Sequence, residues 1–235
     1  MTRTVLVALV LGLAPASAQA QVVAPQPPSI VTQGQAVLRR APDRAFLTVV
    51  VETRDPKAAD ARQTNATVMT SVQAALRTAG IQAGAIRTTG YSLAPEMEYV
   101  NGRGVPRGYL VRNQIEVRVD QLDRLGEVID AANTVKGTGL SIVGPRFVLR
   151  DEEAAENEAL RLAVQAAMAR AESIASGARR TLGAILRIEE SIRPRPEPIM
   201  MRQMMDARAS GNVETPVTAG EIEVRAEVTV TVEIR

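Results

Sequence analysis

Residues 221–235 alternate between apolar and polar side chains without interruption. The apolar positions of this run are Ile222, Val224, Ala226, Val228, Val230, Val232 and Ile234. Because successive side chains of a strand point to opposite faces of its sheet, the run predicts a half-buried antiparallel strand with one face in water. Such a strand needs other segments of the chain to cover the apolar face of its sheet.

Three segments have the three- and four-residue spacing of apolar side chains that is typical of amphipathic helices. They are 56–79, 121–136 and 152–180. An aspartate stands directly before each segment as a predicted N-cap, namely Asp55, Asp120 and Asp151. The many alanines of the third helix imply that it approaches a sheet or another helix closely.

The helical spacing also predicts which side chains are buried. The stripe of the first helix is Ala61, Asn65, Val68, Val72, Ala75 and Ala79. The third helix has two stripes, Ala155, Ala159, Leu162, Ala166 and Leu160, Val164, Ala167, Ala171, Ile174. We interpret the polar Asn65 as a structural amide that ties down a neighbouring loop, because buried polar groups need hydrogen-bond partners.

Shorter alternating or apolar runs predict the remaining strands. These are 30–39, 45–53, 85–99, 109–119, 140–149 and 184–192. The element order is then ββαββαβαββ, which is an α+β fold of largely antiparallel sheets with helices packed on one side. The succession of ββαββ and αβαββ hints at two related lobes. Between the last two strands, the proline-rich RPRPEP predicts an extended loop.

The beginning of the chain has the organisation of a secretory signal peptide. Arg3 precedes the apolar run Val5–Leu13. Ala18-Gln19-Ala20 is a cleavage signal, with Ala16-Ser17-Ala18 as an alternative. We therefore predict a signal peptide at 1–20, a proline-rich linker at 21–29 and one domain at 30–235. The expected location is the periplasm, because no later segment is apolar enough for a membrane helix.

Two residue types that carry much of enzyme chemistry are missing from the sequence. The chain has no cysteine and no histidine, which excludes thiolate chemistry, histidine-based triads and most transition-metal sites. The formal net charge is only +2, and no basic run exceeds two residues, so a nucleic-acid-binding surface is not expected. We predict a protein without catalytic residues or a cofactor.

The stretch GRGVPRGY, residues 102–109, has the glycines of a phosphate-binding loop but not their spacing. Its pattern is G-x-G-x-x-x-G, without the Lys-Ser/Thr of a P-loop, and it leads into a strand instead of a helix. We interpret it as the loop of a hairpin between the strands at 85–99 and 109–119. Arg103 and Arg107 at this tip are candidate contacts for an anionic partner or a lipid headgroup.

All of the tyrosines, Tyr91, Tyr99 and Tyr109, belong to the same predicted hairpin. Clustered tyrosines can bind a ligand or stack on bases, but on regularly alternating strands we favour packing between the strands. Glu96 and Glu98 also lie in this hairpin, on its wet face, and spacing reveals no basic partner that would make them an acid-base pair.

Met200, Met201, Met204 and Met205 recur at helical spacing. Our main interpretation is a short amphipathic helix that docks on a neighbouring subunit or a groove, because methionine adapts well to such surfaces. Two alternatives remain open, an oxidation-sensitive binding segment and a Cu(I) site, because thioethers are soft ligands that oxidise reversibly.

Several of these segments, taken in order, resemble the SIMPL-domain family. The matching motifs are VTQGQAVLRRAPDRAFLTVVVET, the helix residue Asn65, RTTGYSLAPEMEY, GYLVRNQIEVRV followed by QLDRLGEVIDAA, EALRLAVQAAMARAESIA and ETPVTAGEIEVRAEVTVTVEI. They cover about residues 30–235. One departure is Gln35-Ala36, where the family more often continues Gly-Glu-Gly and so has more backbone freedom.

The resemblance implies an exported bacterial protein of the periplasm or the envelope, with association with the outer membrane left open. Relatives are described as oxidative-stress defence proteins or as outer-membrane-associated antigens, and they form ring-like or cylindrical oligomers. The family has no established catalytic residues. The expectation is therefore a non-enzymatic, self-associating periplasmic protein that contributes to envelope or oxidative-stress tolerance, with Cu(I)-binding or oxidant-responsive methionines as the alternative.

Overall fold

The computed structural model describes residues 27–100, 102–135, 139–192, 196–199, 215 and 217–235. The elements follow the chain as β1 Ser29–Arg40, β2 Arg44–Asp55, α1 Ala58–Thr78, β3 Ile86–Val100, β4 Arg103–Val119, α2 Leu125–Asn133, β5 Leu140–Val148, α3 Glu152–Gly177, β6 Leu182–Ile192, β7 Pro196–Ile199 and β8 Glu221–Ile234. Short 3-10 turns lie at Ala83–Ala85 and Leu122–Arg124. The predicted α+β fold is confirmed, with β7 as a short strand where a loop was expected.

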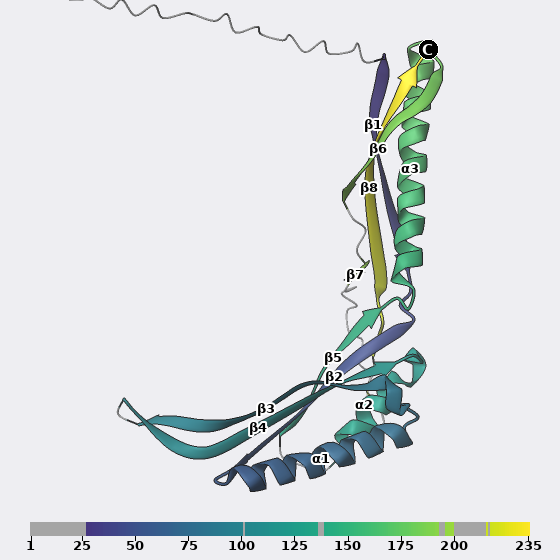
Figure 1. Ribbon diagram of the computed structural model, residues 1–235. Coiled ribbons are helices and arrows are strands. Elements are labelled where there is room, and N and C mark those ends of the chain that lie inside the picture. Colours follow the sequence, from purple (N-terminus) through teal and green to yellow (C-terminus); the bar gives the residue numbers. More distant parts are fainter. Residues whose placement is uncertain (1–26, 101, 136–138, 193–195, 200–214, 216) are drawn as a thin grey trace, which may run out of the picture.

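The strands form two antiparallel sheets, one in the order β1-β8-β6, with β7 also paired to β8, and one in the order β3-β4-β2-β5. Figure 1 shows two arms that meet at a corner near β5 and the start of α3. We call β1, α3, β6, β7 and β8 the α3 arm, and β2–β5 with α1 and α2 the hairpin arm. Because β1 pairs with β8, the two lobes are not successive halves of the chain.

In the α3 arm, one helix covers the face of β1 and β8. The buried residues of α3 recur at steps of four: Ala155, Ala159, Ala163, Ala167, Ala171 and Ala175. The predicted stripes missed Ala163 and Ala175, and Ile174, predicted to be buried, is half exposed. An α-helix has 3.6 residues per turn, so side chains four residues apart are not exactly above one another. The row of buried alanines therefore winds slowly around α3 and follows the twist of the sheet.

In the hairpin arm, α1 covers β2 and β4. Its buried residues are Ala61, Asn65, Met69, Val72 and Leu76, so the prediction was correct for Ala61, Asn65 and Val72. Met69 and Leu76 take the buried places that Val68 and Ala75 were expected to fill. Asn65 Nδ2 donates to the carbonyl oxygen of Val51 at 2.9 Å, which ties the helix to a strand instead of a loop.

The predicted helix ends were only partly correct. Asp151 Oδ1 accepts a hydrogen bond from the Ala154 N–H at 2.8 Å and caps α3 as predicted, but α3 ends at Gly177. The second helix is shorter than expected, because a 3-10 turn precedes α2. Its predicted cap, Asp120, instead accepts from Arg44 at 2.7 Å and from Arg118 at 3.1 Å.

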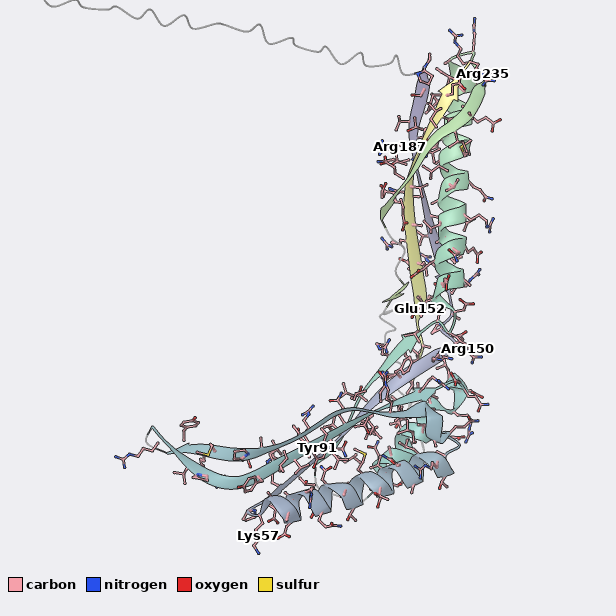
Figure 2. The ribbon with its side chains drawn as sticks, viewed as in Figure 1. Lys57, Tyr91, Arg150, Glu152, Arg187 and Arg235 are labelled. Carbon is pink, nitrogen blue, oxygen red and sulfur yellow. The ribbon has the colours of Figure 1, made fainter. Side chains whose placement is uncertain are left out.

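The corner between the arms is held by charged and polar contacts. The Arg150 backbone N–H, just before α3, donates to Asp43 Oδ1 at 2.6 Å, just before β2. Figure 2 shows Arg150 and Glu152 at this corner and Lys57 at the far end of α1. In the ranges given above, no helix has both the length and the apolar character that a membrane crossing requires.

Candidate functional site

The hairpin of β3 and β4 is closed by a turn much shorter than predicted. Val100 pairs directly with Arg103, and Gly102 has a φ of 77°. The loop expected over 102–109 was therefore wrong, because residues 103–109 belong to β4. The dipeptide Asn101-Gly102 explains the difference, since Asn-Gly is the sequence that two-residue hairpin turns favour.

Beyond Tyr109, the hairpin is a ribbon of two strands only. Asp55, the last residue of β2, pairs with Tyr109, whereas β3 and β4 continue to the turn. Six residues separate Tyr109 from Arg103, so the ribbon extends by about 20 Å at 3.3 Å per residue. Figure 1 shows it projecting away from the rest of the hairpin arm.

The base of the ribbon is shaped by a bulge and a glycine. The pairing register shifts between Glu96 and Met97, where Arg107 is the additional residue of β4. The next residue, Gly108, has a φ of 136°, and a Cβ atom there would lie 2.6 Å from the Asp55 carbonyl oxygen. Only glycine fits this conformation and this space, and a bulge bends its strand. The stretch GRGVPRGY therefore sets the direction in which the ribbon leaves the sheet.

One face of the hairpin is apolar and uncovered. Alternate positions of β3 and one of β4 form it; we call Tyr91, Leu93, Met97, Tyr99 and Tyr109 the hairpin face. The exposed fractions are 54% for Tyr91, 77% for Tyr99 and 37% for Tyr109. Near the tip the face is flat because Gly104, opposite Tyr99, has no side chain.

The tyrosines of the hairpin face do not pack against one another. Their cross-strand partners are Asn113 for Tyr91, Gly104 for Tyr99 and Pro95 for Tyr109. Packing between the strands, as expected from the sequence, therefore covers these rings only in part: a Cβ atom on Gly104 would lie 3.6 Å from the Tyr99 ring, yet Tyr99 stays 77% exposed.

The hairpin face lies on the side of the sheet that α1 covers. Leu93 pairs with Val111, which is fully buried and whose carbonyl oxygen lies 3.5 Å from Asn65 Nδ2 of α1. The uncovered face is thus continuous with the core of the hairpin arm. Spacing alone indicated that Leu93 and Met97 share a face with Tyr91 and Tyr99, but not that α1 leaves this face open.

The opposite face of the hairpin is charged. Glu96 pairs with Arg54 at 3.1 Å, and Glu98 pairs with Arg107 at 2.9 Å. Both glutamates lie on the polar face as predicted, and each has an arginine partner that spacing did not reveal. A structural role in these ion pairs is thus sufficient to explain the two carboxylates, and no acid-base role is needed.

The predicted interaction residues thus meet on one hairpin. Arg103 follows the turn directly, Arg107 occupies the bulge, and the three tyrosines share the hairpin face. Within the part of the chain that the structure describes, no three acidic side chains are grouped as a metal site would require. Met200, Met201, Met204 and Met205 lie outside the described residues, and the hypotheses about them stay predictions.

Comparisons with known proteins agree on one family. The profile of the SIMPL family, a protein of unknown function (DUF541), matches residues 30–232. The 26 kDa periplasmic immunogenic protein of Brucella melitensis is 31% identical over 231 residues, which cover 94% of this chain and 90% of that protein. The uncharacterized protein YggE of Escherichia coli K12 is 26% identical over 224 residues, with coverage of 93% and 85%. The match spans both arms of the structure, and the chain belongs to the SIMPL family.

Proposed function

We propose that this protein is a non-enzymatic, exported protein of the cell envelope that self-associates and contributes to envelope or oxidative-stress tolerance. The observation that supports self-association is the hairpin face, an uncovered apolar surface on a ribbon that projects from the fold. Contiguous apolar patches at the surface of a folded protein mark sites of interaction.

The ribbon itself gives a physical reason for a partner. Two strands without a third strand or a covering helix are marginally stable in water. Covering the hairpin face with another protein surface removes apolar area from water. This burial contributes a favourable free energy of about 25 cal/mol per Å². Tyrosine and methionine are also enriched at protein interfaces, where tyrosine combines an apolar ring with a hydroxyl that can stay hydrated.

The proposed partner is a second copy of this chain. On the opposite face, Glu96 and Glu98 already have arginine partners within this arm. The hairpin face is therefore the surface of the hairpin that would be stabilised by contact with another chain. The proposed location in the periplasm is supported by the name of the Brucella melitensis relative and by the signal-peptide pattern at 1–20. The role in stress tolerance rests on the family resemblance.

Light scattering after size exclusion tests this function. We expect the unmodified protein to be larger than a monomer at micromolar concentration and Tyr99→Ser with Met97→Ser to reduce that mass. Val105→Ser is the matched control, because Val105 pairs with Glu98 on the opposite face and is 46% exposed. A monomer at all concentrations would refute self-association, and equal effects of the two changes would refute the hairpin face as its site.

A further inference from the structure

The second feature of interest is the free edge of β1 in the α3 arm. β1 pairs with β8 from Ser29 to Arg40 without a register shift. In the described residues, no strand pairs with the other edge of β1. A strand of this length therefore presents a row of backbone groups along one side of the sheet.

Two hydrogen bonds show which residues point outward. The Pro28 carbonyl oxygen accepts from the Ile234 N–H, toward β8. The Gln33 carbonyl oxygen instead accepts from Arg170 Nη1 of α3 at 2.9 Å. In an antiparallel ladder, both polar groups of a residue point to the same side and neighbours alternate. The odd-numbered residues of β1 therefore direct their N–H and C=O groups to the free edge.

This edge lacks the usual protection against pairing. Natural proteins guard edge strands with charged side chains, prolines or bulges. From Ser29 to Leu38, β1 contains no charged residue and no proline, and its pairing with β8 has no bulge. Val31 and Val37 are exposed by 62% and 53%. An edge of this kind is suited to the addition of another strand.

The sequence of β1 shows which strand fits. Residues 30–38 read IVTQGQAVL, which is nearly the same in both directions around Gly34. If two copies pair antiparallel with Gly34 opposite Gly34, Val31 of each copy faces Val37 of the other and Gln33 faces Gln35. These are all odd-numbered residues, so the outward backbone groups of the two copies meet in register. Apolar cross-strand pairs add to the stability of such a ladder.

We propose that two copies of this chain join through their β1 edges, antiparallel about Gly34, so that their α3-arm sheets become one continuous sheet. This proposal rests on the proposed self-association and names a second surface for it, separate from the hairpin face. The interface is isologous, since the same residues serve both copies, as in most homodimers.

The surroundings of the edge leave space for the second copy. An open groove of about 730 Å³ runs along it, lined by Val31, Thr32, Gln33, Ala169, Arg170, Ser173, Ile174 and Thr229. A two-fold axis perpendicular to the sheet places both α3 helices on one face, where small residues such as Ala169 and Ser173 allow close approach. The Gln35 N–H of the second copy replaces Arg170 as donor to the Gln33 carbonyl oxygen, so no acceptor is left unpaired.

Disulfide trapping tests the register, because the natural chain contains no cysteine. Val31→Cys and Val37→Cys are made separately, and the two proteins are oxidised alone and as a mixture. In the proposed register, position 31 faces position 37, whereas two copies of position 31 are offset by six residues, about 20 Å. We expect several-fold more disulfide-linked dimer in the mixture than in either protein alone. Val143→Cys, exposed by 59% on the hairpin arm, reports random collisions.

A second variant tests the edge itself. Gln35→Pro removes an outward N–H and adds bulk at the edge, but it leaves the backbone hydrogen bonds to β8 intact. The one bond to β8 that it removes is exposed, from Gln35 Nε2 to Glu227. We expect loss of the trapped dimer with a thermal midpoint close to that of the unmodified protein. If the mixture yields no more dimer than the single proteins while light scattering still shows an oligomer, the β1 proposal is wrong and the proposed function stands. A monomer under all conditions would overturn both.

Discussion

A Cβ atom placed on Gly34 of β1 would lie 2.0 Å from the carbonyl oxygen of Ala163 in α3. The same atom would lie 2.4 Å from the backbone nitrogen of Ala167, and Thr32 Oγ1 donates to the Ala167 carbonyl oxygen at 3.0 Å. Here the backbone of the helix rests almost directly on the backbone of the strand. A glycine on the strand and alanines on the helix are what makes this approach sterically possible.

Gly34→Ala is therefore expected to destabilise the protein by about 1–3 kcal/mol, the usual cost of an overpacked core. The colliding atoms belong to the backbone, so α3 has to shift as a whole. Gly90→Ala is the control, because the nearest atom to a Cβ there is 3.8 Å away. Urea unfolding curves measure the difference. Equal stability of Gly34→Ala and the unmodified protein would contradict the close packing of α3 on β1.

Glu223 of β8 gives the α3 arm a stability that depends on pH. A hydrogen bond from Arg225 lowers the pKa of Glu223 below its ordinary value near 4.5; burial raises the pKa, and Arg39 of β1 lowers it further. A carboxyl with a lower pKa in the folded state stabilises the fold above the unfolded-state pKa and loses this contribution as pH falls through the folded-state value.

Glu223→Gln should accordingly remove part of the pH dependence. We expect the variant to be less stable than the unmodified protein at neutral pH. The difference should shrink as pH falls below 4.5 and through the lowered pKa of Glu223, because the glutamate then becomes neutral, as glutamine is. Thermal unfolding measured from pH 7 to pH 3 checks this. Glu227→Gln on the same strand serves as the control, and a difference that stays constant with pH would rule out the ionic origin.

Local features of the chain were predictable from the sequence, and features set by tertiary geometry were not. The alternation of 221–235 and the Asp151 cap need only neighbouring residues, and both are confirmed. Ala163 and Ala175 were missed because their burial follows the twist of a sheet that forms between β1 and β8, at opposite ends of the sequence. The arginine partner of Glu96 lies on β2, and no spacing along the chain indicates it. The hairpin loop was predicted over 102–109 because glycine and Pro106 are typical turn residues, whereas β4 already begins at Arg103.

Asn65 of α1 is 1% exposed, and its Nδ2 donates to the Val51 carbonyl oxygen. Asn65→Ala should cost about 1–3 kcal/mol, because a buried hydrogen bond is lost and its partner is left with fewer contacts. Asn65→Asp should cost more at neutral pH, since a carboxylate then faces the carbonyl oxygen. Lower pH should narrow the gap between these two variants, because the introduced carboxyl regains a donor when it is protonated. Urea denaturation at two pH values checks the order.

The direction of the ribbon depends on Gly108. Its φ is 136°, and an added Cβ atom would lie 2.6 Å from the Asp55 carbonyl oxygen. Gly108→Ala therefore combines backbone strain with a collision, and we expect a loss of about 1–3 kcal/mol. Gly104→Ala is the matched control in the same stretch, because the nearest atom to an added Cβ there is the flexible end of Met97.

If the hairpin face mediates assembly, Gly108→Ala should also lower the mass measured by light scattering, whereas Gly104→Ala should leave that mass unchanged. Equal behaviour of the two variants would show that Gly108 does not direct the ribbon.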